Sequence, residues 1–255
     1  MIMNGRAISP GKATGKAIVC PEAFSFLGGV DGSTGRFNVM EGDITGKVFV
    51  FPNGKGSTVG SYVIYDLMVH GHAPAALVNR SAETIVTTGA VISSVPMIDS
   101  IDVSVIRDGD DLIVDGDAGT LEIANARMRD VVSSMVVSDG RVLILKRRED
   151  SRSFPGKRSL VSGIVEEGEK PEAAALREIS EETGLKAEPV SSMPPFYIRE
   201  GDVVWHVNPF LFRASGDVKL DGENTGYEWV PVDGFDPSGT VDGVDRIVAH
   251  FADKL

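Results

Sequence analysis

Short runs of apolar residues, separated by glycine and proline, dominate the first half of the chain. Runs bounded in this way are typical of buried strands. The predicted strands of this half are 17–19, 47–51, 75–78, 90–92, 110–114 and 120–123. Residues 62–70 instead carry apolar side chains at helical spacing and stop at Gly71, which predicts a helix. This irregular alternation of strands and helices favours a compact α/β sandwich or an open barrel.

The second half begins with a hairpin signal, because β-branched runs flank the pair Asp139-Gly140. A helix is expected over 172–182, since Pro171 stands near its first turn and Gly184 follows its end. The predicted strands of this half are 135–137, 141–146, 205–212 and 227–230.

A polar segment, 124–134, joins the two halves. Each half is long enough to bury a core of its own. The chain is therefore predicted to hold two domains, residues 1–125 and residues 126–255.

Composition excludes several classes of protein. The 255 residues are 42% hydrophobic and 24% charged, which is ordinary for globular domains and excludes disorder and coiled coils. The net charge is −12 and no basic block is present, which argues against nucleic-acid binding. No apolar stretch is long enough for a membrane span, and the start lacks the apolar core of a signal peptide. The one cysteine, Cys20, allows no internal disulfide or cysteine-ligated cluster within this chain, which fits a cytoplasmic location.

Three glutamates share one face of the predicted helix 172–182. Glu178, Glu181 and Glu182 are spaced i, i+3 and i+4, so their carboxylates project from the same side and repel one another. A hard divalent cation placed among them removes that repulsion, and Mg²⁺ or Mn²⁺ prefers oxygen ligands. The alternative is a solvated acidic helix face, which is a common arrangement.

The spacing around these glutamates resembles the Nudix box, G-x5-E-x7-R-E-U-x-E-E-x-G-U, in which U is aliphatic. The matching positions are Gly163, Glu169, Arg177, Glu178, Ile179, Glu181, Glu182, Gly184 and Leu185. The hairpin, loop, helix and strands around them agree with that family. Residues 132–255 therefore resemble a Nudix domain, which implies an α/β/α sandwich that hydrolyses a nucleoside diphosphate linked to another group, or a related diphosphate.

The resemblance also implies a Mg²⁺ or Mn²⁺ ion. Its expected ligands are the carboxylates of Glu178, Glu181 and Glu182 and the carbonyl oxygen of Gly163. The metal would neutralise the diphosphate and lower the pKa of the attacking water.

Further roles are implied around the metal. Glu169 and Arg177 are expected to orient the cluster, and a carboxylate of the cluster, or Glu223 from a later loop, is expected to act as base. Glu178 and Glu181 are the catalytic candidates. Side chains outside the box that either contact a base or belong to the core are Phe196, Tyr197, Arg199 and Trp205.

A glycine-rich loop lies between the predicted strand 47–51 and the predicted helix 62–70. Its glycines let the backbone approach a ligand, and the amides of residues 57–60 are expected to point outward at the helix start. Ser57 lies there, where negative charge on its oxygen is stabilised. The order Gly-Lys-Gly-Ser excludes a P-loop. The alternative is an ordinary N-cap serine.

More of the first half resembles a known family. The stretches that carry the resemblance are 5–17, 25–31, 54–62, 73–77 and 115–119. Together they are similar to the small subunits of archaeal phosphomevalonate dehydratases, the swivel domain of the aconitase X family, over residues 3–123. The resemblance implies a swivelling β/β/α domain and a large partner subunit that holds an iron–sulfur cluster.

The family also implies that Ser57 abstracts a carbon-bound proton from 5-phosphomevalonate, which then loses water. The loop residues expected to bind that substrate are Gly54, Lys55, Gly56 and Thr58. A serine oxygen is a poor base unless donors stabilise its alkoxide, and the loop amides fit that task. The chain departs from aconitase at Val59, where aconitase has an arginine, so Lys55 or the partner must supply the cation.

Other polar residues receive simpler interpretations. Arg6, Lys12 and Lys16 either contact phosphate or form solvated surface, and the second role is commoner. His70 and His72 flank a glycine at a spacing that does not suit one metal ion, so they are read as turn residues.

The expected function is therefore the small subunit of a phosphomevalonate dehydratase fused to a Nudix diphosphate hydrolase, with small phosphate and diphosphate substrates. Two alternatives stay open. The swivel half is only a docking or regulatory module, or the Nudix half is a diphosphate sensor that regulates the dehydratase.

Overall fold

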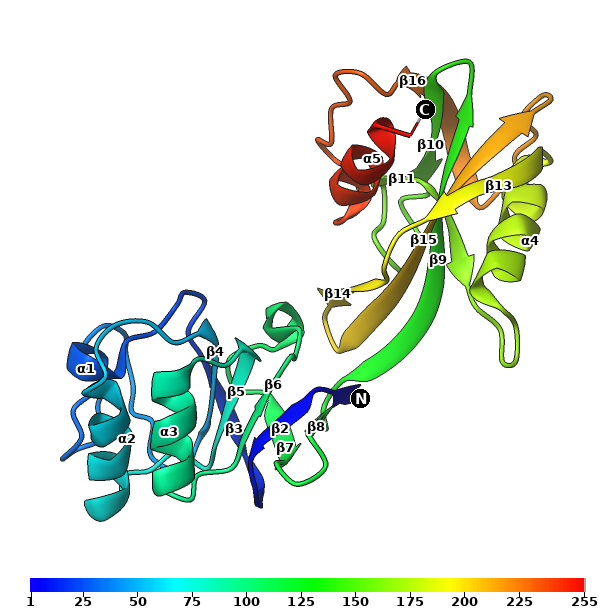
Figure 1. Cartoon of the computed structure of the whole chain (residues 1–255). Helices are drawn as coiled ribbons and strands as arrows, with labels where there is room; N and C mark the ends of the chain where they lie inside the picture. Colours follow the sequence, from blue (N-terminus) through cyan, green and yellow to red (C-terminus); the bar gives the residue numbers. More distant parts are fainter. Residues whose placement is uncertain (255) are drawn as a thin grey trace. The chain divides into compact units, whose positions relative to one another are not determined.

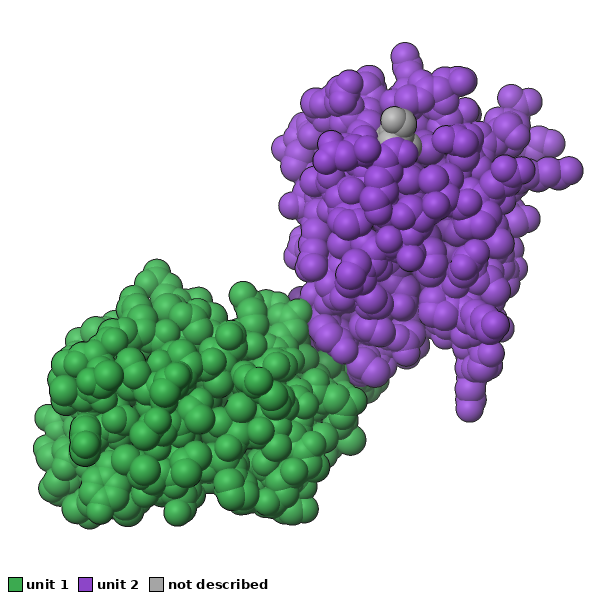
Figure 2. Space-filling model, viewed as in Figure 1, with its two compact units in different colours: residues 1–127 green, residues 128–255 purple. Residues whose placement is uncertain are grey.

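The computed structural model describes residues 1–254 and divides the chain into two compact units, Met1–Arg127 and Met128–Leu255 (Figure 1; Figure 2). Each unit combines a sheet with helices, which confirms the predicted mixed α/β fold with two domains. Within residues 1–254, no helix is both long and apolar enough to cross a membrane.

The first unit is built on eight strands in the order β1-β8-β7-β3-β4-β5-β6-β2. Strand β3 joins its two parts, because its first five residues pair antiparallel with β7 and its last three pair parallel with β4. The strands are β1 Ile2–Asn4, β2 Arg6–Ser9, β3 Lys12–Val19, β4 Val48–Asn53, β5 Ala76–Ser81, β6 Met97–Asp99, β7 Asp111–Asp115 and β8 Thr120–Ile123.

Two helices, α2 (Gly60–Val69) and α3 (Thr84–Ile92), pack beside each other against the β4–β5 part of this sheet (Figure 1). A short helix, α1 (Phe26–Gly29), and a single helical turn at Val103–Val105 complete the unit. Buried phenylalanine rings fill its core and contact one another: Phe24, Phe26, Phe37, Phe49 and Phe51.

Residues 90–92 are not a strand, as predicted, but the last turn of α3. That helix begins where the carboxylate of Glu83 accepts hydrogen bonds from the amides of Ile85 (2.7 Å) and Val86 (2.8 Å). The prediction was wrong because a short apolar run does not distinguish a buried strand from a buried helix end. The other predicted strands and the predicted helix of this half are confirmed, with shifted ends.

The second unit contains a sheet whose main path is β11-β10-β9-β15-β13; β12 pairs with β9, β14 with β15, and β16 with β10. The strands are β9 Arg127–Ser138, β10 Arg141–Arg147, β11 Arg158–Ser159, β12 Val161–Ile164, β13 Lys186–Ser192, β14 Phe196–Glu200, β15 Val203–Ser215 and β16 Asn224–Pro231.

Helices α4 (Pro171–Thr183) and α5 (Val244–Ala252) cover opposite faces of this sheet. Alternate residues of β10 show the arrangement: Leu143 and Leu145 pack with α4, whereas Val142 and Ile144 pack with α5. Because successive side chains of a strand point to opposite faces, this unit is an α/β/α sandwich.

The predicted hairpin is confirmed by the pairing of Val137 with Val142. Its turn residues Asp139 (φ 49°) and Gly140 (φ 70°) are both left-handed, as a two-residue hairpin turn of this type requires. The joining segment 124–134 is mostly strand, because β9 already begins at Arg127. Its polar residues concealed the strand, since the first residues of β9 are exposed.

Candidate functional site

Helix α4 sets the positions of the three glutamates. It begins at Pro171 and ends at Thr183, where the left-handed backbone of the following Gly184 (φ 67°) suits glycine. Ile179 is fully buried and fixes the rotation of the helix about its axis. The exposure of the glutamates therefore differs: Glu181 is exposed, Glu178 is half-buried and Glu182 is buried.

Arg177 connects most of the acidic residues of this site. Its guanidinium donates two hydrogen bonds to Glu169 (3.1 and 3.0 Å), and it also bonds Glu178 (2.7 Å) and Glu181 (3.1 Å). A further bond reaches the carbonyl of Ile164 in β12 (3.0 Å). The hydrogen bonds from Arg177 hold the pKa of Glu169 below its usual value. Arg177 and Glu169 thus form the pair that the sequence places beside the cluster.

Gly163 in β12 lies directly against Glu178. A Cβ atom at position 163 would lie 1.9 Å from the carboxyl carbon of Glu178, so only glycine leaves room for that side chain. Burial, with the charges of Glu181 and Glu223, raises the pKa of Glu178, although Arg177 opposes the rise.

Glu182 is the most deeply buried carboxylate of the cluster. Burial, followed by repulsion from Glu178, Glu223 and Asp221, raises its pKa to about 8. It accepts a hydrogen bond from the side-chain amide of Asn224 (3.5 Å), at the start of β16. The cluster therefore includes Glu223, the residue expected from a later loop.

The donors suit a hard divalent cation, by their chemistry and by two observations. Glu182 is a buried carboxylate repelled by its neighbours, and Glu178 fits against a glycine that leaves it space. Within residues 1–254, no three His, Cys, Asp or Glu side chains are already arranged as a metal site. Arg177 bonds one oxygen each of Glu178 and Glu181, which leaves the second oxygen of both carboxylates for a cation.

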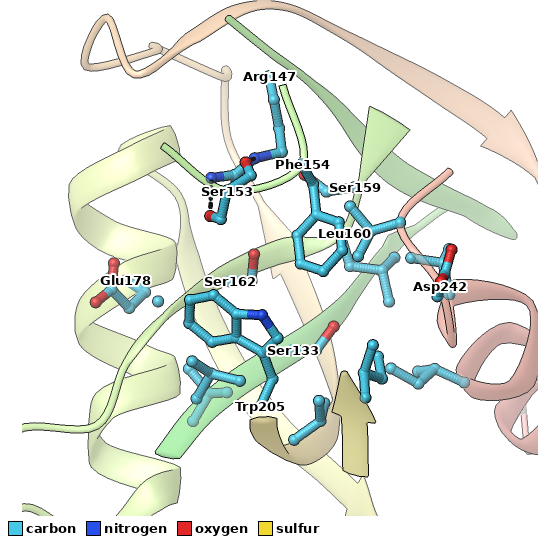
Figure 3. A pocket seen from close by; sticks show the side chains of 18 of the residues that line it. Ser133, Arg147, Ser153, Phe154, Ser159, Leu160, Ser162, Glu178, Trp205 and Asp242 are labelled. Atoms are coloured by element: carbon cyan, nitrogen blue, oxygen red, sulfur yellow. Dashed lines mark hydrogen bonds between the residues drawn. The ribbon is translucent and has the colours of Figure 1, made fainter. Parts of the chain in front are cut away.

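A cavity of about 340 Å³ opens beside Glu178. Figure 3 shows Glu178 at one end and Asp242 at the other, with Phe154 and Trp205 between them. The centroids of the two rings are 6.2 Å apart and the rings are tilted, and more than half of the lining residues are aliphatic or aromatic. Hydroxyl groups on the wall belong to Ser133, Ser153, Ser159 and Ser162. The cavity therefore suits an apolar or aromatic group.

Two of the four side chains expected to contact a base line this cavity, namely Phe196 and Trp205. Tyr197 and Arg199 do not line it. Tyr197 lies instead against the ring of His206, 4.9 Å away. Successive residues of β14 face opposite sides of the sheet, so Phe196 faces the cavity while Tyr197 and Arg199 face the other side.

Other wall residues were not predicted. Leu160 lies between β11 and β12, Val241 and Asp242 precede α5, and Ile247 lies within α5; no local motif marks these residues. Phe154 had a signal, because it precedes a Pro-Gly pair just before the box. Its backbone is left-handed (φ 47°).

In the first unit, Ser57 lies on an exposed turn before α2. Its carbonyl accepts a hydrogen bond from the amide of Gly60 (2.9 Å), and its hydroxyl accepts one from Val59 (3.3 Å). These two amides are therefore used inside the loop, and the expectation that they point outward is wrong. Ser61 is buried and donates to the carbonyl of Thr58 (2.8 Å).

The loop is held by the segment before α1. The amide of Lys55 donates to the carbonyl of Phe24 (2.9 Å), and Gly54 forms an isolated parallel β-bridge with Phe24. Gly56 has φ 103°, and a Cβ there would lie 2.7 Å from the hydroxyl of Ser25. The side chains of Lys55, Ser57 and Thr58 remain exposed.

The basic residues near the N-terminus already have partners. Arg6 bonds the buried carboxylate of Asp99, and the other two pairs are Lys12–Asp115 and Lys16–Asp111 (both 2.7 Å). The turn histidines contact Asp66 and Thr45 respectively.

Two family models match the chain: the aconitase X swivel domain over residues 2–123 and the NUDIX domain over residues 127–251. A relative named phosphomevalonate dehydratase small subunit, from Methanocella arvoryzae, is 50% identical over 132 residues, which are 49% of this chain and 100% of that protein. The crystal structure of Thermococcus kodakaraensis aconitase X in its holo-form is 49% identical, with TM-score 0.47, and covers 48% of this chain and 98% of that chain. The structure of a MutT protein from Methanosarcina mazei is 25% identical, with TM-score 0.45, and covers 51% and 95%.

The fold and the matches define a chain with an aconitase X swivel domain followed by a NUDIX domain, as the sequence predicts. Since it covers the whole of a relative at 50% identity, the chain belongs to the family of phosphomevalonate dehydratase small subunits.

Proposed function

We propose that the NUDIX half hydrolyses an organic diphosphate with Mg²⁺ or Mn²⁺ as its cofactor. One observation carries this proposal: Glu182 is buried, Glu178 is half-buried and Glu223 repels both of them, and Glu178 and Glu223 line a cavity that suits an organic group. Burial of several like charges is costly unless a cation compensates them.

The metal-binding residues come from α4 and β12. Glu178, Glu181 and Glu182 are the proposed metal ligands, with the carbonyl oxygen of Gly163. When bound, the metal supplies positive charge for the diphosphate and lowers the pKa of water.

The remaining roles fall to residues around these ligands. Arg177, positioned by Glu169, orients the glutamates through its hydrogen bonds. Phe154 and Trp205 contact the organic group from the cavity wall, away from bulk water.

The proposed reaction breaks one bridging P–O bond. A water oxygen bonds to one phosphorus atom, and the bridging oxygen leaves with the other phosphorus. A carboxylate, Glu178, Glu181 or Glu223, accepts the proton of the water and later releases it. The products are two phosphates and one proton for each water consumed.

Hydrolysis by the full chain tests this proposal. Nucleotide sugars, dinucleotides, nucleoside triphosphates and isopentenyl diphosphate are incubated with the protein and increasing Mg²⁺. We expect Mg²⁺-dependent release of phosphate or a nucleotide, and a loss of several orders of magnitude in Glu181→Gln. Glu172→Gln, an exposed glutamate in the first turn of α4, is the matched control. Normal turnover by a folded Glu181→Gln variant would remove Glu181 from the metal site.

For the first half, we propose the role of a dehydratase small subunit. The name of the Methanocella arvoryzae relative supports a large partner subunit, which would hold the iron–sulfur cluster. Ser57 is the proposed proton acceptor for 5-phosphomevalonate. The proposed substrate-binding residues are Gly54, Lys55, Gly56 and Thr58.

Reconstitution tests this second role. The chain alone is expected to dehydrate nothing, and the complex with a cluster-bearing large subunit is expected to dehydrate 5-phosphomevalonate. Assembly without any effect of Ser57→Ala would favour a docking role.

We also propose that residues 1–125 and 126–255 fold independently, and two cooperative melting transitions from the separate fragments would support this.

A further inference from the structure

A second hollow adjoins the cavity of the NUDIX half. Its volume is about 360 Å³, and Arg147, Ser153 and Glu223 line both spaces. Glu178 faces only the cavity and Glu182 only the second hollow. The carboxylate cluster therefore lies where the two spaces meet.

The second hollow differs from the cavity in chemistry. Three arginines, Arg147, Arg148 and Arg152, line it together with the carboxylates of Asp150, Glu182 and Glu223, and no aromatic or aliphatic side chain does. We call it the arginine hollow. Guanidinium groups bind phosphate through paired hydrogen bonds, so three of them beside the cluster suit a phosphate group.

The three arginines differ in the hydrogen bonds and ion pairs that they already form. Arg148 forms a paired contact with Asp150 (2.8 and 3.2 Å), and Arg147 donates to the carbonyl and hydroxyl of Ser153 (3.1 and 3.2 Å). Among residues 1–254, Arg152 has no hydrogen-bond or ion-pair partner and is exposed. Its charge is therefore available to a ligand.

One loop, residues 148–157, builds parts of both spaces. It places Phe154 in the cavity and Arg148 and Arg152 in the arginine hollow. The loop is closed by the amide of Gly156, which donates to the carbonyl of Arg148 (3.0 Å). The amide of Phe154 is held by Glu200 (3.1 Å).

We propose that the NUDIX half selects substrates that end in a free phosphate, with the organic group in the cavity and the terminal phosphate in the arginine hollow. The inference rests on the proposed diphosphate hydrolysis. Nucleoside triphosphates and isoprenoid diphosphates share this chemistry. Nucleotide sugars and dinucleotides do not, because a second uncharged group covers their distal phosphate.

The charge of the distal phosphate explains the selection. A free terminal phosphate carries close to two negative charges near neutral pH, whereas an esterified one carries one. A sugar or nucleoside in the arginine hollow would cover the guanidinium of Arg152 without supplying an anion, which is costly. The released product is therefore inorganic phosphate or pyrophosphate.

The experiment compares matched substrates with the full chain and Mg²⁺. One arm uses a nucleoside triphosphate and its γ-methyl ester; the other uses isopentenyl diphosphate and its terminal methyl ester. We expect the free phosphate to be preferred at least about tenfold in kcat/KM in one arm, which also identifies the organic group. Arg152→Ala should remove most of this preference by raising KM, with kcat little changed. Arg213→Ala, an exposed arginine of β15, is the control.

Binding gives a second measurement that needs no turnover. Calorimetry with inorganic pyrophosphate and Mg²⁺ should show roughly tenfold weaker binding to Arg152→Ala than to the wild-type chain. Equal use of free and methylated phosphates by the wild type, or unchanged pyrophosphate affinity in both Arg148→Ala and Arg152→Ala, would overturn the inference. Arginine-dependent binding without any hydrolysis would overturn the proposed hydrolase and support the phosphate site.

Discussion

The serine loop of the first half and the carboxylate cluster of the second use their polar groups in opposite ways. Ser57 is exposed, and its hydroxyl already accepts a hydrogen bond from Val59. Glu182 is buried, and repulsion from Glu178 and Glu223 adds to the cost of its charge. The serine loop matches its motif, but the hydroxyl of Ser57 is already bonded and gives no sign of a missing ligand. The carboxylate cluster gives such a sign, because buried carboxylates that repel one another are costly without a cation.

The largest effect is expected in the assembled dehydratase. Ser57→Ala removes the proposed proton acceptor and keeps the backbone, so the dehydration rate should fall by roughly 10²–10⁴. Ser61→Ala should retain most of the rate, because its hydroxyl is buried against the carbonyl of Thr58. Rates with the large subunit, together with the affinity of assembly, provide the measurement. The reverse pattern would assign the chemistry to Ser61.

A smaller effect is expected from Gly163→Ala. The new methyl group would overlap Glu178, so hydrolysis should fall at least about tenfold and the NUDIX half should lose roughly 1–3 kcal/mol of stability. Gly226→Ala is the control, because nothing lies within 4 Å of a Cβ at that position. Rates and melting curves of both variants measure the difference. Unchanged hydrolysis in Gly163→Ala would show that Glu178 has no fixed place against β12.

The pH dependence of stability gives the next prediction. The folded pKa of Glu182 is about 8 against an ordinary 4.5, so the carboxyl stabilises the fold in its protonated form. Its contribution is complete below pH 4.5 and is lost as pH rises toward 8. In EDTA, the unfolding free energy of the NUDIX half should fall by a few kcal/mol over this range.

Two comparisons isolate Glu182 in that experiment. Glu182→Gln should flatten the decline, because the amide does not titrate. Mg²⁺ should restore stability at high pH through binding to the folded state. Urea unfolding between pH 5 and pH 8 measures both. A wild-type decline that persists unchanged in Glu182→Gln would place the titrating group elsewhere.

The smallest effect concerns the serine loop. Gly56→Ala forces an alanine into a left-handed backbone and against the hydroxyl of Ser25, which should cost the first half roughly 1–2 kcal/mol. Gly46→Ala is the matched comparison, since its φ is also positive but a Cβ there meets nothing within 4 Å. Thermal unfolding of both variants measures the contact with Ser25. Equal losses would show that backbone strain alone sets the cost.

Local signals predicted the carboxylate helix well. Its expected range, 172–182, differs from Pro171–Thr183 by one residue at each end, because proline and glycine mark both ends. The contact of Arg177 with Glu169 also follows from the motif. The ends of a helix and the residues that share one of its faces depend on spacing along the sequence, so they can be predicted without the tertiary structure.

The burial of Glu182 and the cavity could not be predicted in this way. Asn224, the close partner of Glu182, is 42 residues away in the sequence. Trp205 and Phe154 meet only because β15 and the loop 148–157 fold together. The local pattern also did not reveal α5, whose buried face completes the cavity wall. Such contacts depend on tertiary packing, which one sequence does not display.

The loop 148–157 links the cavity and the arginine hollow through a single backbone segment. On the proposed mode of binding, we expect a ligand that orders Phe154 to restrict also Arg152 and Arg148, two and six residues before it. The second group to bind would then lose less conformational entropy than the first, and we expect the two occupancies to be positively cooperative without a change of fold. By linkage, each end of a substrate strengthens the binding of the other to the same degree.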